Sequence, residues 1–202
     1  LNTSTQIPLL FFDMTLGVAI LSTFVPVFNM YLERDGRERA IEFSNNFMTI
    51  VMSAAALFSA VGIIFAEPIV RLMVPGWNAA KVAETASLLR MLFPSIIFTA
   101  AAYTSVGILQ SFGEFNIPSV ISVVSNLIMI LYLLIVGNRF GLAGVIVSMV
   151  IAWASQLLIQ IPPLRRYGYR YRPALNLRDE GIAEAARLAV PVLISSCSRS
   201  AL

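Results

Sequence analysis

Few side chains in this chain of 202 residues could carry out chemistry. The sequence has no His and a single Cys, Cys197, so it predicts no histidine general base, no histidine metal site and no internal disulfide. It also contains no phosphate-binding glycine loop in a strand–helix context, no paired catalytic carboxylates and no nucleophile beside a base. We therefore expect a protein that is not an enzyme and that uses no cofactor and no metal.

Asp13 is the one charged residue of the first long apolar segment, residues 9–31. A carboxylate inside a membrane span costs about 2.5–3.5 kcal/mol on insertion scales, so it usually faces a protein interior or a water-filled cavity. Because Asp13 lies near the start of the segment, a second interpretation stays open: the carboxylate reaches interfacial water or pairs with a basic residue of a preceding helix. We take Asp13 as the candidate substrate-cavity residue.

Other polar or helix-disturbing residues also fall inside apolar segments. Pro26 removes the backbone hydrogen bond to the Ser22 carbonyl, and it is the candidate position for a helix kink. Asn126, Gln156 and Gln160 lie within later segments, where each can form a hydrogen bond between helices worth about 0.6–2 kcal/mol. We expect these three residues to have this structural role rather than a role in a polar translocation path.

The elements that must hold these residues are membrane helices. Hydrophobic residues make up 58% of the chain and charged residues 12%, a balance that cannot cover a soluble fold of this size. Small residues such as Ala101 and Ser105 at four-residue spacing predict close helix packing. We expect an all-α integral membrane protein, a polytopic helical bundle, because neither isolated strands nor a barrel pattern fits. The predicted spans, which form one transmembrane domain over residues 1–202, are 9–31, 43–66, 91–113, 115–137, 140–164 and the start of a sixth from about 188.

The distribution of basic residues predicts the orientation of these spans. The segments after the first, third and fifth spans carry eight arginines, and those after the second and fourth carry four basic residues. The positive-inside rule places the first group in the cytoplasm, so the loops at Arg37, Phe112 and Tyr169 are predicted to be cytoplasmic. The loops at Ala80 and Asn138 then face outward. The Arg- and Tyr-rich stretch 165–172 indicates interface anchoring or anionic lipid rather than nucleic acid. The eight arginines on the predicted cytoplasmic side are Arg34, Arg37, Arg39, Arg165, Arg166, Arg170, Arg172 and Arg178. The four basic residues on the other side are Arg71, Lys81, Arg90 and Arg139.

The connections carry three local predictions. Asn45 and Asn46 are candidate caps where the second span begins. Residues 69–77 indicate an interfacial turn that ends at a Pro-Gly pair, with a Trp at the level of the head groups. Residues 178–189 predict a helix with Asn176 as its N-cap.

Three separated motifs resemble a known family. Residues 19–28 are similar to the second transmembrane helix of the MurJ (MviN) lipid II flippases, and residues 68–77 resemble the outer loop of that family. Leu92-Phe93-Pro94, followed by residues 107–115 and Pro118, resembles its fourth helix and the turn into the fifth. The resemblance covers nearly the whole chain, in order and with matching spacing.

The resemblance implies a helical transporter of the multidrug/oligosaccharidyl-lipid/polysaccharide exporter superfamily, with two lobes around a central cavity and alternating access. This chain would be a fragment that forms part of the N-terminal lobe, with helices two to six and the start of seven. The cavity arginines of the first helix would then precede Leu1. Phe12 and Asp13 stand where many members carry an Arg pair, and Glu114 replaces a commonly basic residue. No substrate-binding residue is therefore transferred onto this chain.

The expected function is transport of lipid II across the bacterial cytoplasmic membrane. The expected partners are lipid II and membrane lipids, with cell-wall synthesis proteins as further candidates and no nucleic acid. Two alternatives remain at this point. One is a related transporter, either a multidrug cation antiporter or another lipid-linked oligosaccharide flippase, and the other is a noncatalytic membrane scaffold in cell-wall assembly.

Overall fold

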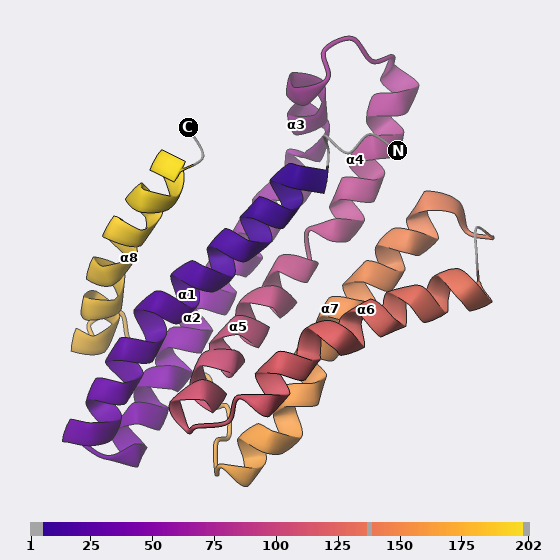
Figure 1. Cartoon of the computed structure of the whole chain (residues 1–202). Coiled ribbons are helices and arrows are strands. Elements are labelled where there is room, and N and C mark those ends of the chain that lie inside the picture. The colour runs from indigo at the N-terminus through magenta and orange to yellow at the C-terminus, as the bar shows by residue number, and fades with distance from the viewer. Residues whose placement is uncertain (1–5, 137–138, 200–202) are drawn as a thin grey trace.

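The computed structural model describes residues 6–136 and 139–199, except for the side chains of 6–16, 18, 190 and 192–199. The described part is helical and contains no strand, which confirms the predicted all-α fold. Figure 1 shows the helices along the chain. They are α1 (Gln6–Arg34), α2 (Arg37–Ile64), α3 (Ala66–Met73), α4 (Ala79–Leu92), α5 (Ser95–Ser111), α6 (Asn116–Ile135), α7 (Gly141–Arg166) and α8 (Glu180–Arg199).

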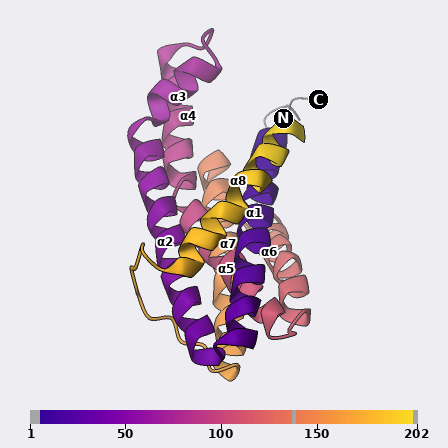
Figure 2. The same cartoon turned by 90° about the vertical axis from the view of Figure 1, so that its left-hand side faces the viewer.

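Helix α5 occupies the centre of the bundle. It packs against α1, α2 and α7, and its residues 99–108, many of them small, are buried except for Tyr103. Helix α6 packs on α7 at one edge of the bundle, and α8 packs on α1 at the other (Figure 1). Figure 2 shows α8 in front of α1 and α2, with the connection from α7 curving beside α2. The burial of Ala101 and Ser105 agrees with the predicted close packing.

Four described helical segments are long and apolar enough to cross a membrane. They are α2, α4 together with α5 (Ala79–Ser111), α6 and α7. The predicted third span begins at Met91, but the helical segment begins at Ala79 and is interrupted at Phe93 and Pro94, where a proline cannot donate the next backbone hydrogen bond. The assignment of the six predicted segments as membrane spans stays a prediction.

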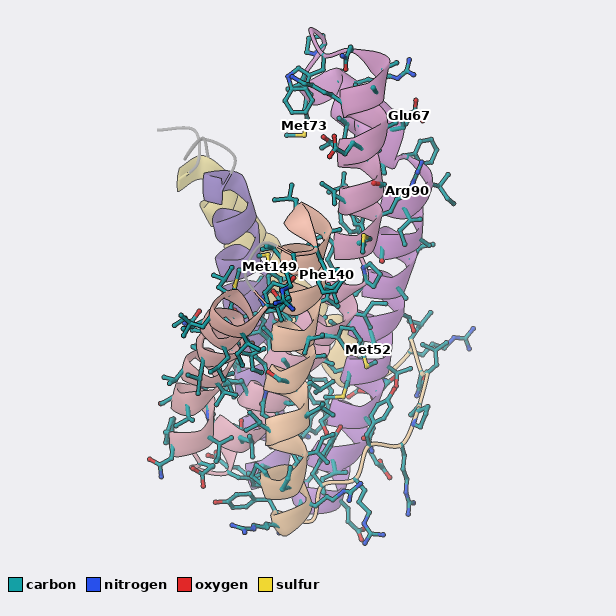
Figure 3. The ribbon with its side chains drawn as sticks, turned by 90° about the vertical axis from the view of Figure 1, so that its right-hand side faces the viewer. Met52, Glu67, Met73, Arg90, Phe140 and Met149 are labelled. Atoms are coloured by element: carbon teal, nitrogen blue, oxygen red, sulfur yellow. The ribbon has the colours of Figure 1, made fainter. Side chains whose placement is uncertain are left out.

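The predicted interfacial turn over residues 69–77 is wrong in its first half, which forms helix α3. Glu67 and Arg71 form an ion pair of 2.7 Å at i,i+4 spacing along this short helix. Its buried residue Val70 packs on Val82 of α4, so tertiary packing supports the helix. Figure 3 shows Glu67 and Met73 on opposite sides of the α3–α4 hairpin.

A cluster of phenylalanines fills the core between α1, α2 and α5. The Phe24 ring lies 5.4 Å from Phe28, 5.6 Å from Phe43 and 5.1 Å from Phe47, measured between centroids. Phe24, Phe28 and Phe43 are completely buried. Gly107 of α5 lies against this cluster, where a Cβ would be 2.7 Å from Cδ1 of Phe24. The absence of a side chain at Gly107 therefore lets α1 and α5 approach closely.

The two glutamines of α7 form the predicted hydrogen bonds between helices. Nε2 of Gln156 donates to Ser125 Oγ of α6 over 3.0 Å. Nε2 of Gln160, which is fully buried, donates to the Ala102 carbonyl of α5 over 3.2 Å. In α6 it is Ser125 that faces α7, whereas the neighbouring Asn126 is exposed. The amides thus tie α7 to both neighbours.

Candidate functional site

The connections that the sequence places in the cytoplasm lie at one end of the molecule. The α1–α2 turn, the α5–α6 turn and the end of α7 meet at the lower end in Figure 1. The α3–α4 hairpin, the end of α6 and the start of α7 lie toward the opposite end. The grouping of these connections agrees with the prediction, although Asn138 itself lies outside the described residues. The side that faces the cytoplasm stays a prediction.

Side chains of α2 hold the segment between α7 and α8 through its backbone. Asn46 accepts from the Asn176 N–H over 2.8 Å and donates to the Asn176 carbonyl over 2.7 Å. Asn45 accepts from the Arg172 N–H over 3.2 Å, and Thr49 accepts from Ala174 N–H over 3.2 Å. We call this set, Asn45, Asn46 and Thr49 with the backbone of residues 172–176, the linker clasp.

The clasp corrects the prediction that Asn45 and Asn46 cap a helix. Helix α2 begins at Arg37, so both asparagines lie inside it, and both are buried. A buried amide must find hydrogen-bond partners, and the backbone of a segment with no regular structure supplies them. Sequence reasoning missed this role because the partner lies far away along the chain.

Asp179 joins the end of the linker to the starts of both α8 and α2. Its Oδ1 accepts from the Gly181 N–H over 2.8 Å, so Asp179 is the N-cap of α8, and the prediction of Asn176 as N-cap is wrong. Asn176 instead accepts from the Arg178 N–H and forms a local turn. The other oxygen of Asp179 accepts from Arg39 over 2.9 Å, and the Asp179 side chain is only 4% exposed.

Aromatic contacts join the three connections at this end. The Arg37 guanidinium lies 5.0 Å from the centroid of the Phe112 ring. The Phe112 ring stacks on Tyr167 at 5.5 Å, and the Tyr167 hydroxyl donates to Glu114 over 3.4 Å. Tyr169 is buried nearby, and burial raises the pKa of its hydroxyl above the usual value. The end of the bundle is therefore one connected structure.

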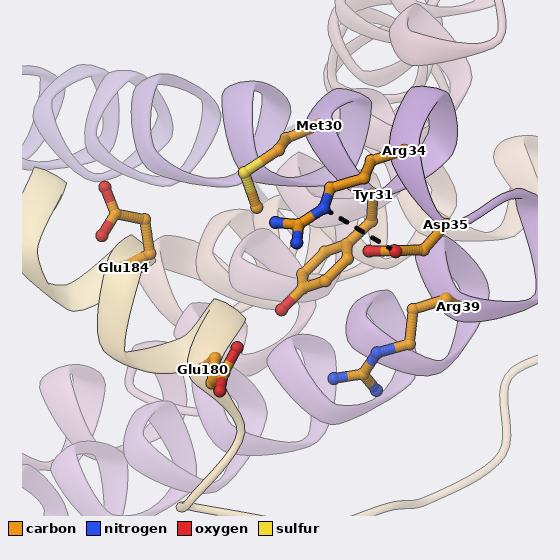
Figure 4. A pocket seen from close by; sticks show the side chains of 7 residues that line it. All are labelled: Met30, Tyr31, Arg34, Asp35, Arg39, Glu180 and Glu184. Atoms are coloured by element: carbon orange, nitrogen blue, oxygen red, sulfur yellow. Dashed lines mark ion pairs between the residues drawn. The ribbon is translucent and has the colours of Figure 1, made fainter.

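A cavity of about 560 Å³ lies between the end of α1, the start of α2 and the start of α8. Figure 4 shows the side chains that line it, and we call it the α1–α8 pocket. Arg34 stands on one wall and is only loosely paired, with its Nε 4.0 Å from Asp35. Glu180 and Glu184 stand on the other wall, one helical turn apart on α8. The lining residues are Met30, Tyr31, Arg34, Asp35, Arg39, Glu180 and Glu184.

Arg39 is held in place at the edge of this pocket. It donates to Asp179 and to Glu42, over 2.9 and 3.3 Å. Its guanidinium also lies 5.0 Å from the centroid of the Tyr31 ring. Arg39 thus belongs to the scaffold of the pocket, and Arg34 is the cation with room to meet a ligand.

The residues predicted from the sequence do not belong to this pocket. Asp13 lies on α1, seventeen residues before Met30, which corresponds to about 25 Å along the helix. The Asp13 side chain lies outside the described residues, so its role stays a prediction. Pro26 is exposed and α1 continues across it, so the predicted kink also stays a prediction. The i,i+4 pair of Glu180 and Glu184 is the one signal in the sequence that could have pointed to the pocket.

The long apolar helices pack closely, and polar side chains gather at the end that holds the linker clasp. These features define a multi-pass α-helical membrane protein. The described residues hold no group of His, Cys, Asp and Glu side chains that could bind a metal ion. The chain belongs to the lipid II flippase MurJ family, whose model matches residues 1–201.

Relatives from several bacteria agree with this membership. The chain is 26% identical over 181 residues to a probable lipid II flippase MurJ of Buchnera aphidicola subsp. Baizongia pistaciae, covering 88% of this chain and 35% of the relative. It is 26% identical over 200 residues to that of Treponema pallidum, covering 94% and 37%. It is 23% identical over 197 residues to the lipid II flippase MurJ of Burkholderia cenocepacia, covering 92% and 38%. The chain thus spans little more than a third of the length of these relatives.

Proposed function

We propose that the full-length protein moves lipid II from the inner to the outer leaflet of a bacterial cytoplasmic membrane, without catalysing a reaction. The observation that carries the proposal is the match of the lipid II flippase family model to residues 1–201. The packed unit of α1, α2 and α5 supports it, because alternating access in transporters proceeds largely by rigid-body motion of such units. The chain itself forms part of the first of the two lobes.

Depletion of the full-length protein in its host should test this function. We expect lipid II to accumulate in the inner leaflet, and a plasmid copy of the full-length gene should restore its exposure outside. A copy limited to residues 1–202 should not, because the substrate cavity lies between two lobes. Unchanged outer-leaflet lipid II in a host with no other flippase would contradict the proposal and favour the cation antiporter.

The orientation of the spans is open to a labelling experiment. Tyr169 is buried, so the exposed neighbour Arg170 is the better probe of the α7–α8 linker, and the exposed Ala80 reports on the α3–α4 hairpin. In a Cys197→Ser background, we expect a membrane-impermeant thiol reagent to label Ala80→Cys in intact cells but not Arg170→Cys. Both positions should react after permeabilisation. The reverse pattern would show that the positive-inside assignment is wrong.

Asp13 is our proposed cavity residue on α1. If its carboxylate faces the cavity or pairs with a basic residue of a preceding helix, Asp13→Asn should impair lipid II transport while the protein stays abundant in the membrane. Glu33→Gln, at the exposed end of the same helix, is the matched control and should be silent. Full complementation by Asp13→Asn at native expression would remove Asp13 from the site.

A further inference from the structure

The two walls of the α1–α8 pocket carry opposite charges that remain available to a ligand. Arg34 is exposed over 77% of its side chain, and within the part of the chain that the structure describes its one ion pair is with Asp35, at 4.0 Å. Among the described residues, Glu180 and Glu184 form no ion pair. Glu180 and Glu184 would repel a ligand that carries only negative charge, and Arg34 would repel a ligand that carries only positive charge. The arrangement instead suits a ligand that carries both charges.

The charge balance of the lining favours an ammonium group in particular. Two arginines, Arg34 and Arg39, face three carboxylates, those of Asp35, Glu180 and Glu184. The Arg39 charge is already matched by Asp179, which lies outside the lining. The pocket therefore has an excess of negative charge, unlike the clusters of Lys and Arg that bind anionic lipids.

The position of the pocket indicates a membrane lipid as the source of this ligand. Helix α1 changes from apolar to charged residues over residues 31–33, where the predicted first span ends and the interface of the membrane is expected. Met30, which is 40% exposed, lines the pocket on the apolar side of this boundary, and Arg34 lines it on the polar side. A cavity of about 560 Å³ is within the range of small-molecule sites and can hold a phospholipid head group.

We propose that the α1–α8 pocket binds the head group of a zwitterionic aminophospholipid, with its phosphate at Arg34 and its ammonium group at Glu180 and Glu184. The ligand is a lipid of the surrounding leaflet and not the transported substrate, so the proposal is independent of lipid II transport. The head group would form charge-assisted hydrogen bonds both with Arg34 and with the two glutamates, and this class of hydrogen bond contributes most to binding.

Titration of the purified full-length protein by native mass spectrometry tests the proposal. The probes are palmitoyl-oleoyl phosphatidylethanolamine and the corresponding phosphatidylglycerol, added in detergent without lipid II. We expect the wild type to prefer phosphatidylethanolamine. The doubly substituted Glu180→Gln/Glu184→Gln protein should lose at least roughly tenfold in affinity for it, as expected when hydrogen bonds to charged groups are lost. Its affinity for phosphatidylglycerol should not fall.

Glu38→Gln is the matched control, because Glu38 is an exposed carboxylate of the same end of the molecule but does not line the pocket. It should leave both affinities unchanged, whereas Arg34→Gln should weaken phosphatidylethanolamine binding. Equal wild-type affinity for the two lipids, or an unchanged preference in the doubly substituted protein, would overturn the proposal. Binding of soluble phosphoethanolamine as tight as that of the lipid would overturn the assignment to a membrane lipid.

Discussion

Replacement of Asp179 by Ala is expected to lower the free energy of unfolding by about 2.5–4 kcal/mol. Loss of the N-cap of α8 accounts for about 1 kcal/mol. Loss of the hydrogen bond from Arg39, a charged donor that reaches a nearly buried carboxylate, accounts for about 1.5–3 kcal/mol. Thermal or detergent-induced unfolding of the full-length protein measures the total, and hydrogen exchange over residues 170–185 should show where the structure opens.

Two further variants separate these contributions. Asp179→Asn removes the charge but keeps an oxygen that can cap α8. Because the cap remains, this variant should be less destabilising than Asp179→Ala by about 1 kcal/mol. Glu42→Ala removes the other carboxylate that contacts Arg39, but Glu42 is 69% exposed, and exposed ion pairs contribute only about 0–1 kcal/mol. A loss at Glu42→Ala as large as that at Asp179→Ala would contradict the central role given to Asp179.

Substitution of Gly107 by Leu should cost about 3 kcal/mol, near the upper end of typical overpacking penalties. Even a Cβ at this position would lie 2.7 Å from the Phe24 ring, and that ring is enclosed by Phe28, Phe43 and Phe47. Because the ring has no free space, α1 and α5 would have to separate. Unfolding of the full-length variant and the yield of folded protein after detergent extraction measure the effect.

A double-mutant cycle distinguishes overpacking from a general intolerance of α5. Phe24→Leu shortens the side chain that opposes Gly107, so the cost of Gly107→Ala should be smaller in that background than in the wild type. Helix propensity alone would make Gly107→Ala favourable by about 1 kcal/mol, opposite in sign to the steric effect. Strictly additive costs would show that Phe24 and Gly107 do not limit each other.

The helices were predictable because their signal is local. Long apolar segments such as those of α2 and α7 meet the length needed to cross a bilayer wherever they pack. Helix α3 was missed because Pro68 stops the apolar run and the Pro-Gly pair after the helix favours a turn, although a proline is tolerated in the first turn of a helix. Its contacts with α4 outweigh that preference, and such contacts are visible only in three dimensions.

The polar end was only partly predictable for a related reason. The sequence indicates that Asn46 is a residue type that prefers helix caps. It does not indicate that Asn176 is its hydrogen-bond partner. The α1–α8 pocket likewise depends on how Arg34 and Glu184 approach from helices distant in the sequence. Composition indicates which residues prefer the interface, whereas their pairing follows from the packing of α8 on α1.

The linker clasp also constrains the order in which the bundle assembles during synthesis. Asn46 and Asn176 are separated by 130 residues, so their hydrogen bonds cannot form until all the helices from α2 to α7 have left the ribosome. Until then Asn45 and Asn46, which are buried in the folded structure, lack these hydrogen-bond partners. The clasp is therefore a late contact of large sequence separation, the kind of contact that slows folding because loop-closure entropy is lost before it forms.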